Sequence, residues 1–331
     1  MLIKTITLAN FRNHTKYHLE CKPTTTLIIG ANGCGKTSVL EAIYILTRGK
    51  SFRSTDPEII KHGAPFYRIE LEYNSGIKTT AIYDGKAKTF LTSDKKTRRL
   101  PKNSRYPVVL FEPSDLNLIT GSPSRHRDYF NRYFGGISEE YASSVSRYDK
   151  ALRQRNELLK SELCSSTSLF SWNLLLAKYG TTISHLRAKY TTAINQELTK
   201  VYRSIAENSD EVNLNLITEV NVDLTESSYL KTLERNQPKD QCIGHTTFGI
   251  HKDDFEFIFN GKKASGSASR GETRSVMLAL KFIEADTLEQ TTGEKPIILL
   301  DDVFSELDET RRKALVNNFK THQVIITSVE K

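Results

Sequence analysis

Residues 30–37 constrain this chain of 331 residues more than any other segment, because they read glycine, four further residues, glycine, lysine and threonine. An apolar, β-branched run (residues 26–29) precedes the pattern, and apolar residues at helical spacing follow it. This order predicts a strand, a glycine-rich turn and a helix, in which successive N–H groups point toward phosphate oxygens. A chance glycine-rich turn is the alternative, but it accounts for neither the strand nor the helix. We predict a nucleoside triphosphate site.

The position of each residue in this loop predicts its role. Lys36 is expected to reach the β and γ phosphates and to act in catalysis, and the Thr37 hydroxyl is expected to bind a magnesium ion. The loop residues predicted to contact ATP are Gly30, Ala31, Asn32, Gly33, Cys34, Gly35, Lys36 and Thr37.

A second candidate segment follows Pro296, where an apolar run ends in two adjacent carboxylates, Asp301 and Asp302. Such a run is typical of a central parallel strand that is buried on both faces, and open α/β sheets bind ligands at the carboxyl ends of their strands. We predict that Asp301 binds magnesium and that Asp302 is catalytic, orienting the attacking water. A pair of helix-capping carboxylates is the alternative.

A third candidate lies at residues 269–274, before another helical pattern. Ser269 with Glu272 three residues later predicts a capping box at the start of that helix. The N–H groups of a helix start attract anions, so we predict that Ser269 and Gly271 contact the γ-phosphate of a nucleotide. Two such sites in one chain can act on one nucleotide only when two copies meet, which predicts an ATP-dependent homodimer.

These motifs carry a resemblance to a known family. Residues 269–274 resemble the signature loop of ABC-type ATPase heads, residues 305–308 resemble their D-loop, and residues 6–14 are similar to the start of SMC-like DNA repair ATPases. Further matches occur at residues 50–53, 111–116, 121–127 and 249–254. Together the ordered set resembles the RecF family of bacterial recombination mediators. Many ABC-type heads have Glu at the position of Asp302 and a switch His at the position of Thr327, so slow hydrolysis is expected.

The resemblance implies an ATP-dependent protein of DNA repair and replication that dimerises around nucleotide. It would bind duplex DNA near single-strand gaps, including junctions with single-stranded DNA, without sequence preference. It would also help RecO and RecR to load the recombinase RecA in gap repair and in the SOS response to DNA damage. A weak, DNA-stimulated ATPase is implied, with Arg12 a candidate contact at the edge of the nucleotide.

The same patterns predict an α/β architecture, an ABC-type P-loop ATPase head with a mixed sheet and an inserted helical lobe. We assign residues 1–112 to the first part of the head, 113–241 to the inserted lobe and 242–331 to the completion of the head. Alternating residues 66–92 predict antiparallel hairpins added to the nucleotide sheet. Apolar stripes at residues 141–159 and 172–205 predict a short antiparallel helical hairpin, and residues 234–241 a loop.

The composition agrees with a polyanionic partner, since 47 Lys and Arg against 39 Asp and Glu give a net charge of +8. The basic residues crowd residues 95–105, 125–132 and 147–160, where the last group includes Arg155. Solvated surface is the alternative for each group. Four scattered cysteines (Cys21, Cys34, Cys164 and Cys242) indicate a reducing compartment. With no signal segment and no membrane span, we expect a soluble, cytoplasmic protein.

Two other functions stay open at this point. A P-loop enzyme that phosphorylates a small molecule would be monomeric, and it leaves residues 269–274 and 305–308 without a role. A DNA-binding scaffold with a decayed ATPase is the other alternative, because Asp302 and Glu272 depart from the usual residues.

Overall fold

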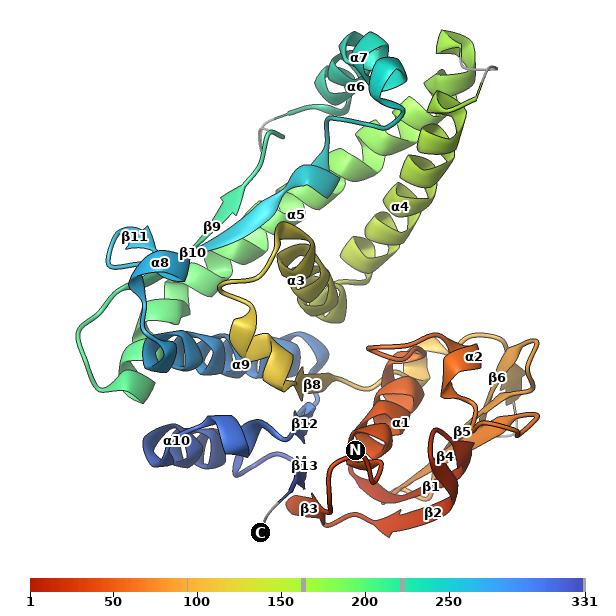
Figure 1. Ribbon diagram of the computed structural model, residues 1–331, viewed down its shortest axis with the longest axis vertical. Helices are drawn as coiled ribbons and strands as arrows, with labels where there is room; N and C mark the ends of the chain where they lie inside the picture. The colour runs from red at the N-terminus through yellow and green to blue at the C-terminus, as the bar shows by residue number, and fades with distance from the viewer. Residues whose placement is uncertain (94, 162–164, 221–223, 330–331) are drawn as a thin grey trace. The chain divides into compact units, whose positions relative to one another are not determined.

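The computed structural model describes residues 1–93, 95–161, 165–220 and 224–329, and the chain forms two compact units. The head unit comprises Met1–Leu116 and Glu284–Lys331, and the insert unit comprises Asn117–Ile283 (Figure 1). Within the described ranges, no helix is both long and apolar enough to cross a membrane. Cys164 lies outside the described residues, and Cys21, Cys34 and Cys242 are free thiols.

The head unit contains two sheets. The antiparallel sheet has the order β2-β1-β4-β5-β6-β7, with β1 (Ile3–Phe11), β2 (His14–Glu20), β4 (Tyr67–Tyr73), β5 (Lys78–Tyr83), β6 (Lys88–Thr92) and β7 (Lys95–Thr97). The parallel sheet has the order β3-β13-β12-β8, with β3 (Thr25–Ile29), β13 (Val324–Ser328), β12 (Ile297–Asp301) and β8 (Val108–Phe111). All five residues of β12 are buried, as expected for a central strand covered on both faces.

The hairpins of residues 66–92 form as predicted, but they do not extend the nucleotide sheet. Instead β4 pairs along β1, from Ile6↔Leu71 to Ala9↔Arg68, so the hairpins complete a separate antiparallel sheet. The alternation of buried and exposed residues fixed the strands themselves, whereas the pairing partner of β4 depends on a strand far away in the sequence. The expected addition to the nucleotide sheet was therefore wrong.

Helix α1 (Lys36–Arg48) packs against strands of both sheets (Figure 1). Its residues from Ser38 to Thr47 are all buried, which is typical of a helix enclosed on every side. The helix ends at Gly49, whose φ of 84° is the left-handed conformation that favours glycine. The remaining elements of the head are α2 (Asp56–Ile59), the short 3-10 turns Lys102–Ser104, Pro113–Asn117 and Val303–Glu306, and α10 (Glu309–Phe319).

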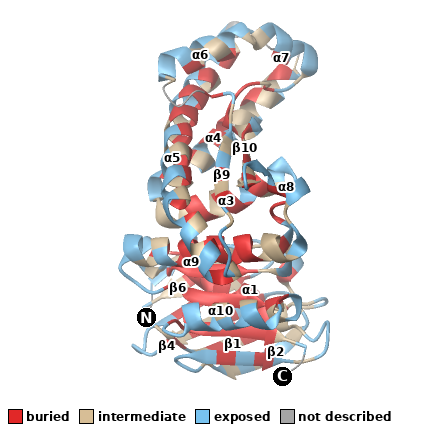
Figure 2. Cartoon of the chain, turned by 90° about the vertical axis from the view of Figure 1, so that its left-hand side faces the viewer, coloured by how far each residue is buried: buried red, intermediate tan, exposed pale blue. Residues whose placement is uncertain are grey.

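The insert unit is built on a helical hairpin, as predicted. Helix α4 (Glu139–Leu159) packs along α5 (Ser166–Ala206), a helix of 41 residues. Figure 2 shows buried and exposed residues dividing α5 along its length, as an amphipathic stripe requires. The other elements are α3 (Pro123–Ile137), β9 (Val212–Ile217), α6 (Glu226–Arg235), α7 (Gln237–Ile243), the 3-10 turn Ile250–Lys252, β10 (Asp254–Phe259), β11 (Lys262–Lys263), α8 (Ala264–Ser267) and the first part of α9 (Arg270–Thr292), whose residues from Glu284 onward belong to the head unit.

Three details of the insert unit differ from the sequence interpretation. Gln237–Ile243 is helix α7 rather than part of a loop. Residues 242–283 belong to the insert unit by their contacts, because β10 pairs with β9 along its whole length, from Asp254↔Ile217 to Phe259↔Val212. Arg155, which we grouped with a basic surface, is fully buried and forms an ion pair of 2.7 Å with Asp240, so it presents no charge to solvent.

Candidate nucleotide-binding site

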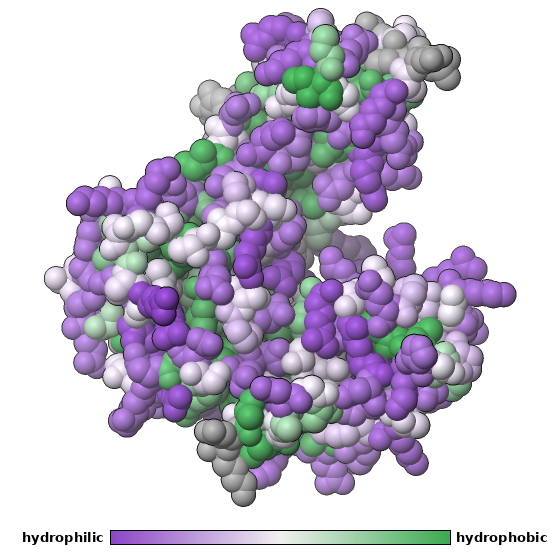
Figure 3. Space-filling model, viewed as in Figure 1, coloured by the Kyte–Doolittle hydropathy of each residue, from purple (hydrophilic) through white to green (hydrophobic). Residues whose placement is uncertain are grey.

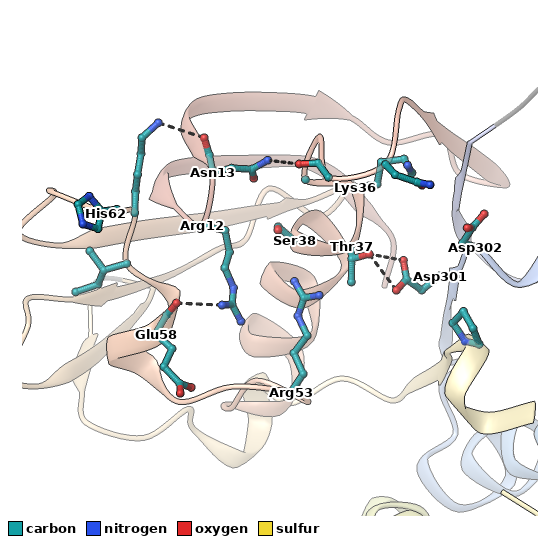
Figure 4. Close-up of a pocket in the computed structure, with 16 residues that line it drawn as sticks. Arg12, Asn13, Lys36, Thr37, Ser38, Arg53, Glu58, His62, Asp301 and Asp302 are labelled. Atoms are coloured by element: carbon teal, nitrogen blue, oxygen red, sulfur yellow. Dashed lines mark hydrogen bonds between the residues drawn. The ribbon is translucent and has the colours of Figure 1, made fainter. Parts of the chain in front are cut away.

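A cavity of ≈ 860 Å³ opens in the head unit at the carboxyl ends of β3 and β12 (Figure 4). It is lined by Arg12, Asn13, Asn32, Gly33, Gly35, Lys36, Thr37, Ser38, Arg53, Glu58, Ile60, Lys61, His62, Pro113, Asp301 and Asp302. The cavity thus brings together most of the residues that the sequence singled out in the glycine-rich loop and after β12. Gly30, Ala31 and Cys34 belong to the same loop without lining the cavity. Ser269 and Gly271 lie in the insert unit, at the start of α9.

The turn between β1 and β2 braces the glycine-rich loop. Asn13 Nδ2 donates to the Gly33 carbonyl at 3.0 Å, and His14 Nε2 donates to the Gly35 carbonyl at 3.1 Å. Gly35 has a φ of 102°, and a Cβ atom there would lie 2.3 Å from His14 Nε2. Only glycine therefore permits both the curled backbone and this close approach.

Lys36 lies folded over its own loop. Its ammonium group donates to the carbonyls of Gly30 at 2.7 Å and Ala31 at 3.0 Å. Hydrogen bonds to neutral carbonyls are weaker than those to charged oxygens, so a phosphate that enters the loop competes well for this cation.

The Thr37 hydroxyl meets the carboxylate of Asp301 directly, at 2.8 Å from Oδ1 and 3.0 Å from Oδ2. These two groups are 264 positions apart in the chain, and the parallel sheet that contains β3 and β12 brings them together. A hydroxyl and a carboxylate are hard oxygen ligands of the kind that magnesium prefers, and magnesium usually takes only one or two protein ligands of this type. The residues therefore fit a magnesium ion.

Asp302 continues from Asp301 in the left-handed backbone conformation, with a φ of 50°. The Asp302 N–H donates hydrogen bonds to the Thr327 carbonyl oxygen at 3.2 Å and to the Thr327 hydroxyl oxygen at 3.0 Å. The same hydroxyl lies 2.8 Å from Asp301 Oδ1. Asp302 Oδ1 is buried and has no hydrogen-bond partner among the described residues. A buried carboxylate oxygen with unused capacity can accept a hydrogen bond from a water or ligand in the cavity.

Glu41 of α1 lies behind the cavity wall and is completely buried. It accepts hydrogen bonds from Arg12, Arg53 and Ser51, the shortest being 2.7 Å from the Ser51 hydroxyl to Oε1. Burial alone would raise the pKa of Glu41, but the hydrogen bonds from the two arginines and Ser51 outweigh it and lower the pKa. Glu41 therefore favours its ionised form, and it holds two cations at the cavity.

The start of α9 has the predicted capping box. The Ser269 N–H donates to Glu272 Oε2, and the Glu272 N–H donates to Ser269 Oγ at 3.3 Å. Both hydrogen bonds of the predicted capping box are therefore present at the start of the helix.

Sequence reasoning gave no role to three residues of this site. Glu41 lies within an apolar helical run, and Arg53 lies in a short loop after α1. Thr327 was named only as the position at which many ABC-type heads have a switch His, and no role was predicted for its hydroxyl. A usable signal was present for Glu41, because a carboxylate within a run of buried residues needs a cationic partner. The two nearby arginines, Arg12 and Arg53, were candidates for that partner.

Comparisons with known proteins agree with this geometry. The sequence model of the RecF/RecN/SMC N-terminal domain family matches residues 2–331. The DNA replication and repair protein RecF of Clostridioides difficile is 32% identical over 346 residues, which cover 100% of this chain and 92% of that protein. The protein of the same name from Acholeplasma laidlawii is 33% identical over 331 residues, covering 99% and 93%.

A solved structure described as the recombination mediator protein RecF-ATP in the RecFOR pathway superposes with a TM-score of 0.90 at 29% identity. The match covers 100% of this chain and 92% of that one. The predicted fold class, an α/β ABC-type ATPase head with an inserted helical lobe, is thereby confirmed. This chain belongs to the RecF family.

Proposed function

We propose that this chain is an ATP-dependent DNA-binding protein of recombinational repair. The observation that carries the proposal is the contact between Thr37 and Asp301, at 2.8 Å, inside a cavity that Lys36 also lines. That arrangement is the one a P-loop and a carboxylate at the end of another strand of the same sheet use to hold a nucleotide with its metal. The RecF-ATP structure, which matches the whole chain, supports ATP as the nucleotide.

Within this proposal, the N–H groups of residues 30–37 and the Lys36 ammonium bind the triphosphate. Magnesium, held by Thr37 and Asp301, would neutralise phosphate charge. Asp302 would orient the attacking water through its unpartnered Oδ1 and accept a proton from it. Because a single short carboxylate does this, hydrolysis is expected to be slow and to act as a switch.

Phosphate contacts are expected to dominate DNA binding. The basic residues of the head unit at Lys95, Lys96, Arg98, Arg99, Lys102 and Arg105 are all exposed, as are Arg147, Lys150, Arg153 and Lys160 of the insert unit. Figure 3 shows hydrophilic residues over most of the visible face, with hydrophobic residues in small groups. Binding through such residues depends on phosphates and duplex shape and has little sequence preference. Duplex DNA at a single-strand gap is the proposed target.

We further propose that ATP closes a homodimer in which Ser269 and Gly271 of each copy contact the γ-phosphate bound by the other. A two-fold dimer contains two such composite sites. In the cytoplasm the dimer would mark gapped DNA for RecO and RecR, which load RecA in gap repair, replication restart and the SOS response. The RecFOR description of the matched structure supports this placement.

Replacing Lys36 with Met tests the central claim. ATP binding and ATP-dependent binding to gapped duplex DNA should both be lost, because the triphosphate loses its main cation. Lys78→Met is the matched control, since Lys78 is an exposed lysine of β5 that pairs with Glu72 outside the cavity. Wild-type ATP affinity in the Lys36 variant would remove the nucleotide site from this loop.

Ser269→Arg tests the composite site. The bulky side chain would fill the space beside the start of α9, so ATP binding to the monomer should persist while ATP-driven dimerisation fails in sedimentation experiments. Mixing this variant with Lys36→Met protein should restore part of the dimerisation, because the heterodimer contains one intact site. Normal dimerisation by the Ser269 variant alone would reduce residues 269–272 to a helix cap.

A further inference from the structure

Helix α5 exposes large apolar side chains near its beginning. Phe170 is 46% exposed, Leu174 is 44% exposed and Leu175 is 36% exposed. Residues four positions apart lie on the same face of a helix, so Phe170 and Leu174 stand in one line, with Leu175 beside them. Scattered exposed apolar residues need no explanation, but adjoining ones are typical of binding surfaces. We call these three residues the apolar patch.

One turn further along α5, the same face becomes cationic. Lys178 follows Leu174 by four residues, and its ammonium group lies 5.9 Å from the centre of the Tyr179 ring. Arg147 belongs to α4, which packs beside α5 (Figure 1). Its guanidinium lies 5.6 Å from the centre of the same ring, and Nη1 donates to the Tyr179 hydroxyl at 3.1 Å. Two cations therefore lie against one aromatic ring at the end of the apolar patch.

Both cations have unused hydrogen-bond donors. A guanidinium has five N–H groups, and among the residues that the structure describes Arg147 donates to the Tyr179 hydroxyl alone. Lys178 has no carboxylate partner in that part of the chain, and both residues are exposed. Helix α5 offers them none there, since residues 165–196 contain no Asp or Glu. The patch and its cations therefore suit a ligand that is both apolar and anionic.

Single-stranded DNA has both properties. A nucleotide strand combines charged phosphates with flat base faces, and proteins that hold single strands place exposed aromatic rings among basic residues. Continuous duplex hides these faces in its base stack, whereas a gap exposes them. The exposed residues from 147 to 160 include four basic side chains against two acidic ones, so phosphate contacts can continue along α4 away from the patch. An acidic peptide with apolar side chains would use the patch but not this continuation.

We propose that Phe170 stacks on a base of single-stranded DNA at the edge of a gap, while Arg147 and Lys178 bind the neighbouring phosphates. The inference rests on the proposed DNA-binding function and names the residues that distinguish a gap from continuous duplex. Phe170 and Lys178 are eight residues apart, which is about 12 Å along a helix, so a strand of a few nucleotides can reach both. Leu174 and Leu175 would shield the stacked base from water.

The first experiment compares gapped duplex DNA with continuous duplex of the same length, binding to the full chain with ATP and magnesium. Phe170→Ala should weaken binding to gapped DNA at least about fivefold, which corresponds to the lower end of base–aromatic stacking. Binding to continuous duplex should stay within about twofold, because its phosphate contacts remain. Phe170→Tyr should keep the wild-type preference, since it retains the ring. Phe66→Ala is the matched control: Phe66 is 39% exposed in the head unit, and both affinities should stay unchanged.

The second experiment separates the base contact from the phosphate contacts by titrating a thymidine oligonucleotide at several salt concentrations. Arg147→Gln should lower the slope of log affinity against log salt by about 0.7, as expected for one phosphate of a single strand. Phe170→Ala should lower the affinity without changing that slope, because it removes no charge. A slope for Arg147→Gln equal to that of wild type would refute the phosphate contact.

A competition experiment tests the acidic peptide as the occupant of the patch. A poly-glutamate peptide with the same net charge as the oligonucleotide should displace it poorly, since the peptide has no bases to stack on Phe170. Equal displacement by the two polyanions would refute the base contact.

The outcomes distinguish this inference from the proposed function. Wild-type protein that binds gapped DNA, with the full preference for a gap retained by Phe170→Ala, would overturn the base contact alone. Wild-type protein that binds no DNA would overturn the proposed function instead. A Phe170 variant that no longer dimerises with ATP, yet binds gapped DNA as tightly as wild type, would assign the apolar patch to an interface between two copies and refute the proposal.

Discussion

Each unit contains an arginine that forms an ion pair with a buried carboxylate, and the two arginines differ in how many of their hydrogen-bond donors remain unused. Arg53 of the head unit is 35% exposed and has three N–H groups without an acceptor among the described residues. Arg187 of the insert unit is 1% exposed, and its three nitrogens donate to Tyr141, Ile250, Asp253 and Asn131. The first is arranged to receive a ligand, and the second completes a polar network inside the unit.

The same distinction holds for the carboxylates. Asp302 has an oxygen without a partner at the edge of the cavity. Asp253, in contrast, accepts from Arg187 at 2.5 Å and from Thr218 at 2.6 Å while it is almost completely buried. Burial raises the pKa of Asp253 even though the charge of Arg187 opposes the shift. Unused hydrogen-bonding capacity beside a cavity, rather than charge or burial alone, therefore separates candidate ligand-binding groups from structural ones.

Among the variants that test this comparison, Asp253→Asn is expected to have the largest effect. The substitution leaves Arg187 as a buried cation that cannot lose its proton, which should lower the free energy of unfolding of the insert unit by about 3–5 kcal/mol. Trp172 of α5 is the single tryptophan and reports this unit in urea unfolding followed by fluorescence. ATP affinity should stay within about twofold of wild type. An unchanged unfolding midpoint would contradict the structural role of the pair.

The stability of the insert unit should depend on pH through His251, a mostly buried histidine of the structural kind. Its Nε2 lies 3.1 Å from the Thr246 carbonyl and must carry the proton, so Nδ1 accepts from the Tyr148 hydroxyl at 2.9 Å. Burial lowers the pKa of His251 to about 4, below its ordinary value of 6.5. The unfolded chain therefore takes up a proton near pH 6.5 while the folded chain stays neutral. Stability is fully present above pH 6.5 and falls by about 3 kcal/mol as the pH drops toward 4.

The test compares wild type with His251→Gln by urea unfolding at several pH values, again through Trp172. The variant should be less stable at neutral pH but should lose less stability than wild type between pH 6.5 and 4. Other groups titrate equally in both proteins, so the difference isolates His251. Parallel pH profiles would show that this histidine is not held neutral by its surroundings.

The sequence predicted the local parts of the molecule well. The turn before α1, the buried strand ending at Asp301 and the helical hairpin follow from periodicity over neighbouring residues, and the structure contains all three. The separate antiparallel sheet was not predicted, because the pairing of β4 with β1 is a choice between distant strands. Helix α7 was missed because a short polar helix has too few apolar residues to show a period.

The candidate site follows the same rule. Lys36, Thr37, Asp301 and Asp302 could be named because fixed spacing within each motif carries their identity. For Glu41 the sequence gives only the need for a cationic partner, because its contact with Arg53 depends on how the loop after α1 returns to that helix. Arg155 was grouped with a basic surface because composition does not show which residues are buried. Its partner Asp240 is 85 residues away, so their contact depends on the fold of the insert unit.

Asp302→Asn tests the unpartnered carboxylate of the head unit. The amide preserves the shape but cannot accept a proton from water, so single-turnover ATP hydrolysis should slow by at least about 100-fold. ATP affinity should change little, and the ATP-bound dimer that we propose should persist longer. Asp301→Asn is the contrasting variant, because it should weaken binding of magnesium and ATP instead. Hydrolysis at the wild-type rate in the Asp302 variant would place the water elsewhere.

The smallest effect concerns the basic residues, which differ in exposure as Arg53 and Arg187 do. Arg98→Gln and Arg99→Gln remove exposed charges of the head unit, so each should weaken DNA binding severalfold for every sequence tested. If each residue contacts one phosphate, the slope of log affinity against log salt should fall by about 1 per contact removed. Arg155→Gln is the control, because Arg155 is fully buried against Asp240: it should destabilise the insert unit and leave the salt slope unchanged. Titration of gapped duplex DNA at several salt concentrations measures both quantities, and the slope is the more informative one, since partial unfolding lowers the active fraction without changing the number of phosphates contacted. Equal salt slopes for wild type and the Arg98 and Arg99 variants would mean that exposure of a basic side chain does not mark the DNA surface of this protein.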